Sequence, residues 1–125
     1  MESLDVANVL AGVPVRDMTT AIDWFTRLLG RGPDARPMPS LADWDFANRQ
    51  TLQVVLDTER AGGGVLTLHV PDIAAARDLL ARQDIHLRFD DTSSDKVTFG
   101  QLTDPDGNSI TLVEPFPGFD PTASH

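Results

Sequence analysis

The first half of the chain shows apolar residues at two spacings, one typical of strands and one typical of a helix. A run of strand-forming residues, VANVLAGVPV (residues 6–15), comes first. Apolar residues at helical spacing follow, at Ala21, Trp24, Phe25 and Leu28. Asp17 stands where an N-cap residue is expected, and Gly30 stands where a helix ends. Short apolar runs near residues 35–38, 44–47 and 51–57 then predict three strands.

The second half repeats this order. The segment VPDIAAARDLLAR (residues 70–82) matches VRDMTTAIDWFTR (residues 15–27), with Val, Asp, Ala, Asp and Arg in register at a constant offset of 55 residues. A strand-like run, GVLTLHV, precedes it, and Asp72 is the expected N-cap. The apolar helix positions are Ile73, Ala76, Leu79 and Leu80. Three strand-like runs follow, HLRFD, KVTFGQL and SITLVE.

This repeat predicts an α+β fold made of two βαβββ modules in a single domain, residues 1–125. The modules span about residues 5–60 and 64–116, and residues 117–125 form a tail rich in proline and glycine. We expect Phe116 and Phe119, near this end, to cover a sheet edge. Neither half can cover both faces of a curved sheet, so we expect the modules to pack together and to enclose a cleft as the ligand site.

The stretch LTDPDGNSITLVE (residues 102–114) predicts a hairpin whose second strand faces that cleft. Gly107 can adopt the positive φ that a tight turn requires. In the strand after it, Ser109, Thr111 and Val113 alternate with Ile110 and Leu112, so the two sets face opposite sides of the sheet. With the apolar pair in the core, Thr111 points into the cleft.

The amino-acid composition limits the classes of molecule that the protein is expected to bind. The chain of 125 residues has a formal net charge of -9 and no cysteine. Disulfides, thiolate zinc sites and thiol nucleophiles are therefore excluded. A strongly acidic chain is unsuited to nucleic acid or an anionic membrane surface, so a cationic or neutral small molecule is favoured. No signal peptide or membrane-spanning run is evident, which predicts a cytoplasmic protein.

Three segments together resemble the vicinal oxygen chelate superfamily, which includes glyoxalase I, extradiol dioxygenases, fosfomycin-modifying enzymes and bleomycin-resistance proteins. They are VPVRDMTTAIDWFTRLLG, LTLHVPDIAAARDLL and LTDPDGNSITLVE. The resemblance covers nearly the whole chain and implies the fold rather than one reaction. It also implies a homodimer, with modules paired within one chain or across two.

Metal-dependent members of that superfamily have a histidine on the first strand and a carboxylate on the last strand of each module. The matching positions are Leu10 and Val65 for the histidines, and Gln53 and Thr111 for the carboxylates. Two hydrocarbons, an amide and a hydroxyl do not form the nitrogen and carboxylate set of a catalytic divalent ion. We therefore expect no metal and no cofactor.

Several other residues are candidates for the cleft, each with a structural alternative. His69 lies on the same strand face as Val65 and Thr67 and is a candidate general base, although a hydrogen-bonded structural histidine is the commoner case. Trp44 and Phe46 share a strand face and form either a wall for a planar or cationic ligand or part of the core.

Three charged residues complete the candidate set. Arg88 either orients an anionic group or is an exposed edge charge. Asp57 and Glu114 end the last strand of each module and either reach the cleft mouth or are solvated.

Two functions remain open. The first is a metal-free binding protein similar to the bleomycin-resistance members, which sequesters a small cationic or aromatic ligand in an acidic cleft. The second is a glyoxalase-like lyase or isomerase, or a dioxygenase-like enzyme, which uses His69 or a non-standard metal site.

Overall fold

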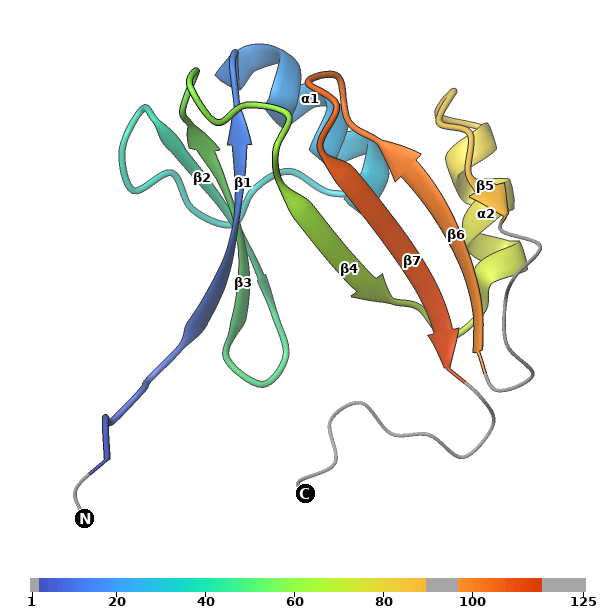
Figure 1. The fold of residues 1–125 in the computed structure, drawn as a ribbon, viewed down its shortest axis with the longest axis horizontal. Helices are drawn as coiled ribbons and strands as arrows, with labels where there is room; N and C mark the ends of the chain where they lie inside the picture. Colours follow the sequence, from blue (N-terminus) through green and yellow to red (C-terminus); the bar gives the residue numbers. More distant parts are fainter. Residues whose placement is uncertain (1–2, 90–96, 116–125) are drawn as a thin grey trace.

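A computed structural model describes residues 3–89 and 97–115 (Figure 1). In chain order the elements are β1 (Val9–Val15), α1 (Met18–Leu29), β2 (Leu41–Phe46), β3 (Gln50–Leu56), β4 (Val65–His69), α2 (Ile73–Ala81), β5 (Arg88–Phe89), β6 (Val97–Thr103) and β7 (Ser109–Pro115). The predicted tail, with Phe116 and Phe119, lies outside the described residues.

The strands form two mixed sheets, which confirms the α+β prediction. The strand order is β1-β3-β2 in the first sheet and β4-β7-β6-β5 in the second. In each sheet the first strand of a half pairs in parallel with its last strand, and the other neighbours are antiparallel. One of the three strands predicted after the first helix, the one near residues 35–38, is wrong, because only an isolated bridge joins Ala35 to Asp43. Pro37 and Pro39 explain this, since proline cannot donate to a strand ladder.

Both helices begin where the sequence predicts. The Asp17 carboxylate accepts a hydrogen bond from the Thr20 amide, and α1 ends at Gly30 in the left-handed conformation, with φ 77°. Asp72 caps α2 in the same way. Of the apolar residues at helical spacing in α2, Ile73 and Leu80 are buried, whereas Leu79 is exposed. Neither helix in the described residues is long and apolar enough to cross a membrane.

One apolar core joins both sheets to both helices. Phe25 of α1 packs edge-on against Trp24, at 4.9 Å between ring centroids, and lies 6.0 Å from the ring of Trp44 in β2. The second sheet contributes Leu66, Ile110 and Leu112, which are all buried. The predicted alternation along β7 is thereby confirmed. Figure 1 shows the two sheets close together near the top of the view and farther apart toward the lower ends of β3 and β4.

The turn between β6 and β7, through its buried Asp104 and Asn108, joins the two halves at the narrow end. Asn108 donates from Nδ2 to the Pro14 carbonyl at 2.8 Å and accepts the Gly64 amide at 2.6 Å. Asp104 holds this side chain from the other side, at 2.7 Å. Gly107 has a φ of 94°, as the turn prediction requires. The turn therefore ties the end of β1 to the segment that leads into β4.

Candidate functional site

The main cavity lies between the β2–β3 hairpin and β4, and we call it the inter-sheet groove. Its volume is about 630 Å³, and an adjoining space of about 190 Å³ continues it between β1, β3 and β4. The two share Phe46, Gln50, Thr67 and Leu68. The other residues that line the main space are Leu29, Ala47, Asn48, His69 and Val70. The groove is therefore built from both halves of the chain.

The hairpin places Phe46 at the edge of this groove. Strand pairing continues to Phe46 opposite Gln50, and residues 47–49 turn the chain. Asn48 and Arg49 both have positive φ, at 63° and 58°. Asparagine tolerates this conformation better than most residues, which suits it to such a turn. Phe46 therefore extends past the part of β2 that α1 covers, and its side chain is 39% exposed.

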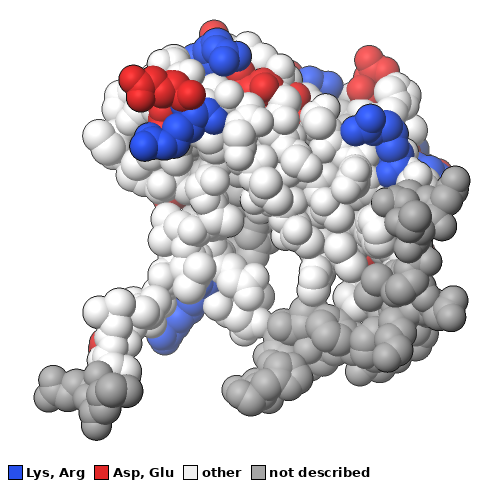
Figure 2. Space-filling view, in the orientation of Figure 1, with Lys and Arg blue, Asp and Glu red and all other residues white. Residues whose placement is uncertain are grey.

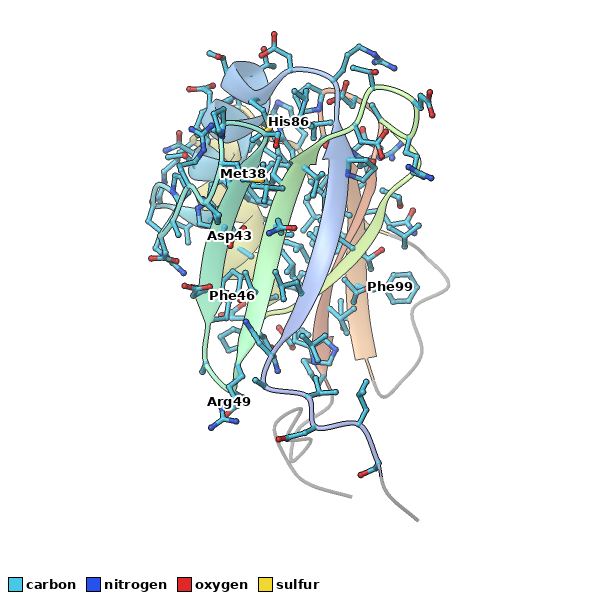
Figure 3. All side chains as sticks on the ribbon, turned by 90° about the vertical axis from the view of Figure 1, so that its left-hand side faces the viewer. Met38, Asp43, Phe46, Arg49, His86 and Phe99 are labelled. Atoms are coloured by element: carbon cyan, nitrogen blue, oxygen red, sulfur yellow. The ribbon has the colours of Figure 1, made fainter. Side chains whose placement is uncertain are left out.

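Arg31 stacks on the Phe46 ring. The central guanidinium carbon lies 5.5 Å from the ring centroid, within the range of a cation–π contact. Two further contacts fix the guanidinium, one with the Asp34 carboxylate and one with the Asp45 carbonyl oxygen at 2.7 Å. The hydrogen bond from Arg31 is the largest cause that lowers the pKa of Asp34. Figure 3 labels Phe46 on the hairpin, close to Arg49 at its tip.

His69 lines the opposite side of the groove, at the end of β4. The register pairs Thr67 with Thr111 and His69 with Val113, so the predicted common face of these strands is confirmed. His69 is exposed. The structure thus brings together Phe46 and His69, two of the predicted site residues.

The described lining of the groove is not acidic. Among the described residues, no Asp or Glu lines either of its two spaces. Figure 2 shows a broad white surface over the middle of the molecule, with most of the visible charged side chains toward the top of the view. The expectation of an acidic cleft is therefore wrong for this groove, because net charge does not say where the charges lie.

Two predicted site residues lie elsewhere in the first sheet. Trp44 is 0% exposed, and its indole nitrogen donates to the Arg31 carbonyl at 2.9 Å. Trp44 is a core residue, which is one of the two alternatives that the sequence left open for Trp44 and Phe46. Gln53 lies on the opposite sheet face, where its Nε2 donates to Asp43 at 2.9 Å (Figure 3 labels Asp43).

The two strand-end carboxylates have local partners. Asp57 accepts hydrogen bonds from the Arg60 side chain at 2.9 Å and from the Arg60 amide at 3.2 Å. These bonds lower the pKa of Asp57, the side-chain bond being the largest cause. Glu114 accepts the Ile73 amide at the start of α2, at 2.9 Å. Neither is among the described residues that line the groove, so a place at its mouth stays a prediction for both.

Thr111 and Arg88 lie together on the face of the second sheet that points away from the core. The register runs from Thr67 through Thr111 and Gln101 to Arg88. Thr67, at one end of this row, lines the groove, whereas Thr111, Gln101 and Arg88 are not among the described residues that line it. A ligand role for Thr111 or Arg88 stays a prediction.

The positions implied for a metal do not fit one. Leu10 and Val65 have hydrocarbon side chains, Gln53 is bonded to Asp43, and Thr111 offers a neutral hydroxyl. Within residues 3–89 and 97–115, no group of three or more His, Cys, Asp or Glu side chains is placed to hold a metal ion. We derive no chemistry through a metal at these positions.

Sequence reasoning missed Arg31, Gln50 and Asn48. Asn48 and Arg49 stand between two strand-like runs, so the turn had a sequence signal. Arg31 had none, because its contact with Phe46 depends on the path of residues 30–40.

The chain resembles known proteins at the level of solved structures. No family model matches the chain, and no curated protein matches it. Among solved structures, a glyoxalase/bleomycin resistance protein from Catenulispora acidiphila DSM 44928 is 30% identical, with a TM-score of 0.78 over 85% of this chain and 96% of that one. TnmS3, an antibiotic binding protein from Streptomyces sp. CB03234, is 22% identical, with a TM-score of 0.75 over 91% and 99%.

A putative glyoxalase family protein from Bacillus anthracis has the same fold, at 17% identity and a TM-score of 0.74 over 92% of this chain and 99% of that one. The first match is close enough in sequence, and covers enough of both chains, to show the family as well as the fold. The chain belongs to the glyoxalase/bleomycin resistance protein superfamily, the vicinal oxygen chelate proteins.

Proposed function

We propose that this protein is a metal-free binding protein that sequesters a small aromatic molecule in the inter-sheet groove. The observation that carries the proposal is the position of Phe46, whose half-exposed ring faces a groove that β4 closes on the other side. An exposed ring beside a concave apolar surface is suited to stack on a planar ligand.

The size and the lining of the groove support this proposal. A volume of about 630 Å³ lies within the range of small-molecule sites. The lining combines apolar side chains with the neutral polar groups of Asn48, Gln50 and Thr67 and the imidazole of His69. The similar fold of an antibiotic binding protein is further support.

Replacement of Phe46 by alanine tests the proposal. We expect the affinity for a planar probe such as 2-naphthol to fall by roughly ten-fold, because stacking and buried ring area are lost. Phe89→Ala is the matched control, since Phe89 is also an exposed phenylalanine stacked under an arginine, but on β5. Calorimetric titration of both variants measures the difference. Unchanged affinity in Phe46→Ala would contradict the proposal.

The enzyme hypothesis keeps one supporting observation, because His69 lines the same groove. A general base must lie within reach of the bound substrate. If the protein is a glyoxalase-like lyase, the hemithioacetal of methylglyoxal and glutathione is consumed by the wild type and not by His69→Gln. If it is a binding protein, neither form turns this substrate over.

We also propose a homodimer. β1 is an edge strand of its sheet, and the segment before it extends away from the body in Figure 1. Leu4, on this segment, is 88% exposed, and Val65 on edge strand β4 is 80% exposed. Exposed apolar side chains along open strand edges favour pairing with another chain. The cytoplasmic location stays a prediction.

Sedimentation at micromolar concentration tests the assembly. The wild type is expected to sediment as a dimer and Val65→Lys as a monomer, because a desolvated charge opposes the contact. Leu79→Lys on α2 is the control, since Leu79 is also exposed. A monomeric wild type would contradict the proposal.

A further inference from the structure

We infer that the inter-sheet groove selects electron-rich or anionic aromatic ligands over cationic aromatics of the same size, because the Arg31 guanidinium lies over one face of the Phe46 ring. This inference rests on the proposed binding function and specifies its ligand class. It reverses the preference that the net charge of -9 would suggest.

The cation beside the groove is the Arg31 guanidinium. Arg31 lies over the Phe46 ring at 5.5 Å from the centroid, while Phe46 lines both spaces of the groove. Among the described residues that line these spaces, Arg31 is absent. The guanidinium therefore occupies one side of the ring and leaves its other surfaces to the groove.

The Arg31 guanidinium is held in a fixed orientation. The guanidinium donates to the Asp34 carboxylate and to the Asp45 carbonyl, so two separate groups hold its orientation. The carbonyl of Arg31 in turn accepts the indole N–H of the fully buried Trp44. Both the side chain and the backbone of Arg31 are thus fixed to the core and to the strand that carries Phe46.

The Arg31 guanidinium changes which ligands the Phe46 ring attracts. The faces of an aromatic ring are electron-rich, which is why cations bind there. A guanidinium on one face draws this density toward itself, so the opposite face attracts a second cation less and an electron-rich ring more. The Asp34 carboxylate cancels much of the Arg31 charge at a distance. The selectivity therefore acts on a group stacked directly on Phe46.

Acidic side chains are absent from the described lining of the two spaces of the groove. The chain has 19 acidic residues, yet none of those described lines the groove. Asp45 precedes Phe46 in β2, and its side chain accepts a hydrogen bond from Thr51 at 2.9 Å. It lines a third space of about 430 Å³, which shares Phe46 and Gln50 with the groove and is also lined by Arg49. A cation in the two spaces of the groove itself thus has no carboxylate partner among their described lining residues.

Three naphthalene probes of similar size test the inference: neutral 2-naphthol, anionic 2-naphthoate and cationic 2-naphthylmethylammonium. Titrations at pH 7.5 in about 0.3 M salt screen the net charge beyond a few ångströms. We expect naphthol and naphthoate to bind the wild type roughly five-fold more tightly than the cation, the size of a cation–π contribution. This comparison needs no variant to fold.

Arg31→Gln supplies the second readout. The preference against the cation is expected to disappear in this variant, while Arg77→Gln retains it. Arg77 is the matched control, because it removes the same charge from another arginine–phenylalanine stack, at 5.5 Å over Phe89. Urea unfolding of both variants verifies that they fold.

The outcomes separate the inference from the proposed function. If the wild type binds the cation as tightly as the other probes or more tightly, and Phe46→Ala weakens all three, the charge preference is refuted and groove binding stands. A preference that persists in folded Arg31→Gln also refutes the role of Arg31. If no probe binds, or Phe46→Ala changes none of the affinities, both the inference and the proposed function fail.

Discussion

Asn108 is the side chain whose loss should most disturb the joint between the two halves. It is 1% exposed, and its amide group bonds the Gly64 amide, the Pro14 carbonyl and the Asp104 carboxylate. Asn108→Ala removes all three bonds at once. It leaves a part-buried donor, a part-buried acceptor and a buried carboxylate without these partners.

The expected loss of stability follows from the free-energy cost of buried polar groups that lack hydrogen-bond partners. Each buried polar group left unsatisfied costs about 1–3 kcal/mol, and water entering the space of the lost side chain offsets part of this. We therefore expect a loss of about 3–4 kcal/mol from a total of about 5–15 kcal/mol. For a chain of this length the melting temperature should fall by roughly 10–15 °C.

Urea unfolding followed by tryptophan fluorescence measures this loss. Asn8→Ala is the matched control, because Asn8 is exposed and its amide makes a single 3.0 Å bond to Thr51. We expect the control to lose less than about 1 kcal/mol. A loss of that size in Asn108→Ala would refute the reasoning, since the apolar core alone would then hold the halves together.

Asn108→Asp adds a pH dependence to the same test. The new carboxylate would lie beside Asp104, and two carboxylates in one buried site raise the pKa of the pair above its value in the unfolded chain. A raised folded-state pKa means that stability is gained as pH falls. The deficit of this variant relative to the wild type should therefore shrink between pH 7 and pH 4.5. A constant deficit over that range would contradict the proposed geometry.

Three further predictions concern the core, the linker and the surface. Trp44→Ala should cost about 3–5 kcal/mol in urea unfolding, as expected for a buried aromatic side chain, whereas a stacking-wall residue would cost far less. Gly64→Ala should destabilise the protein and Gly32→Ala should not, because a Cβ at Gly64 would lie 2.8 Å from a buried amide oxygen and one at Gly32 meets nothing within 4 Å. The Asp57 carboxyl should titrate below 3.8 by NMR, because Arg60 hydrogen bonds lower its pKa. Its contribution to stability is then present above about pH 4 and is lost as pH falls through the folded-state pKa, and Arg60→Gln should return the midpoint toward 3.8.

Local signals in the sequence predicted the elements well where one residue decides the backbone. Asp17 caps a helix and Gly107 forms a turn because each satisfies a requirement of its own backbone neighbours. Alternation also placed His69 and Thr111 on one face of the second sheet, since side-chain direction in a strand has a period of two. The strand predicted at residues 35–38 failed because Pro37 within the run and Pro39 just after it cannot donate to a strand ladder.

The site depended on information that no local pattern contains. Trp44 and Phe46 have the same strand parity, yet Phe25 of α1 packs near Trp44 while Phe46 extends beyond the helix. The alternation of side chains along a strand predicts that two residues share a face. Only the packing of the helix on the sheet shows how much of that face is covered. The contact of Arg31 with Phe46 depends on a loop path, and the neutral lining of the groove depends on the positions of charges rather than on their sum.

The most direct test of ligand binding in the inter-sheet groove is an NMR titration of the labelled protein with 2-naphthol. The amide signals of residues 46–50 and 67–70 are expected to shift together with a single dissociation constant, and Phe46→Ala should weaken that constant. Shifts centred instead on Gln53 or on Thr111 and Arg88, none of which lines the groove, would contradict the proposed site.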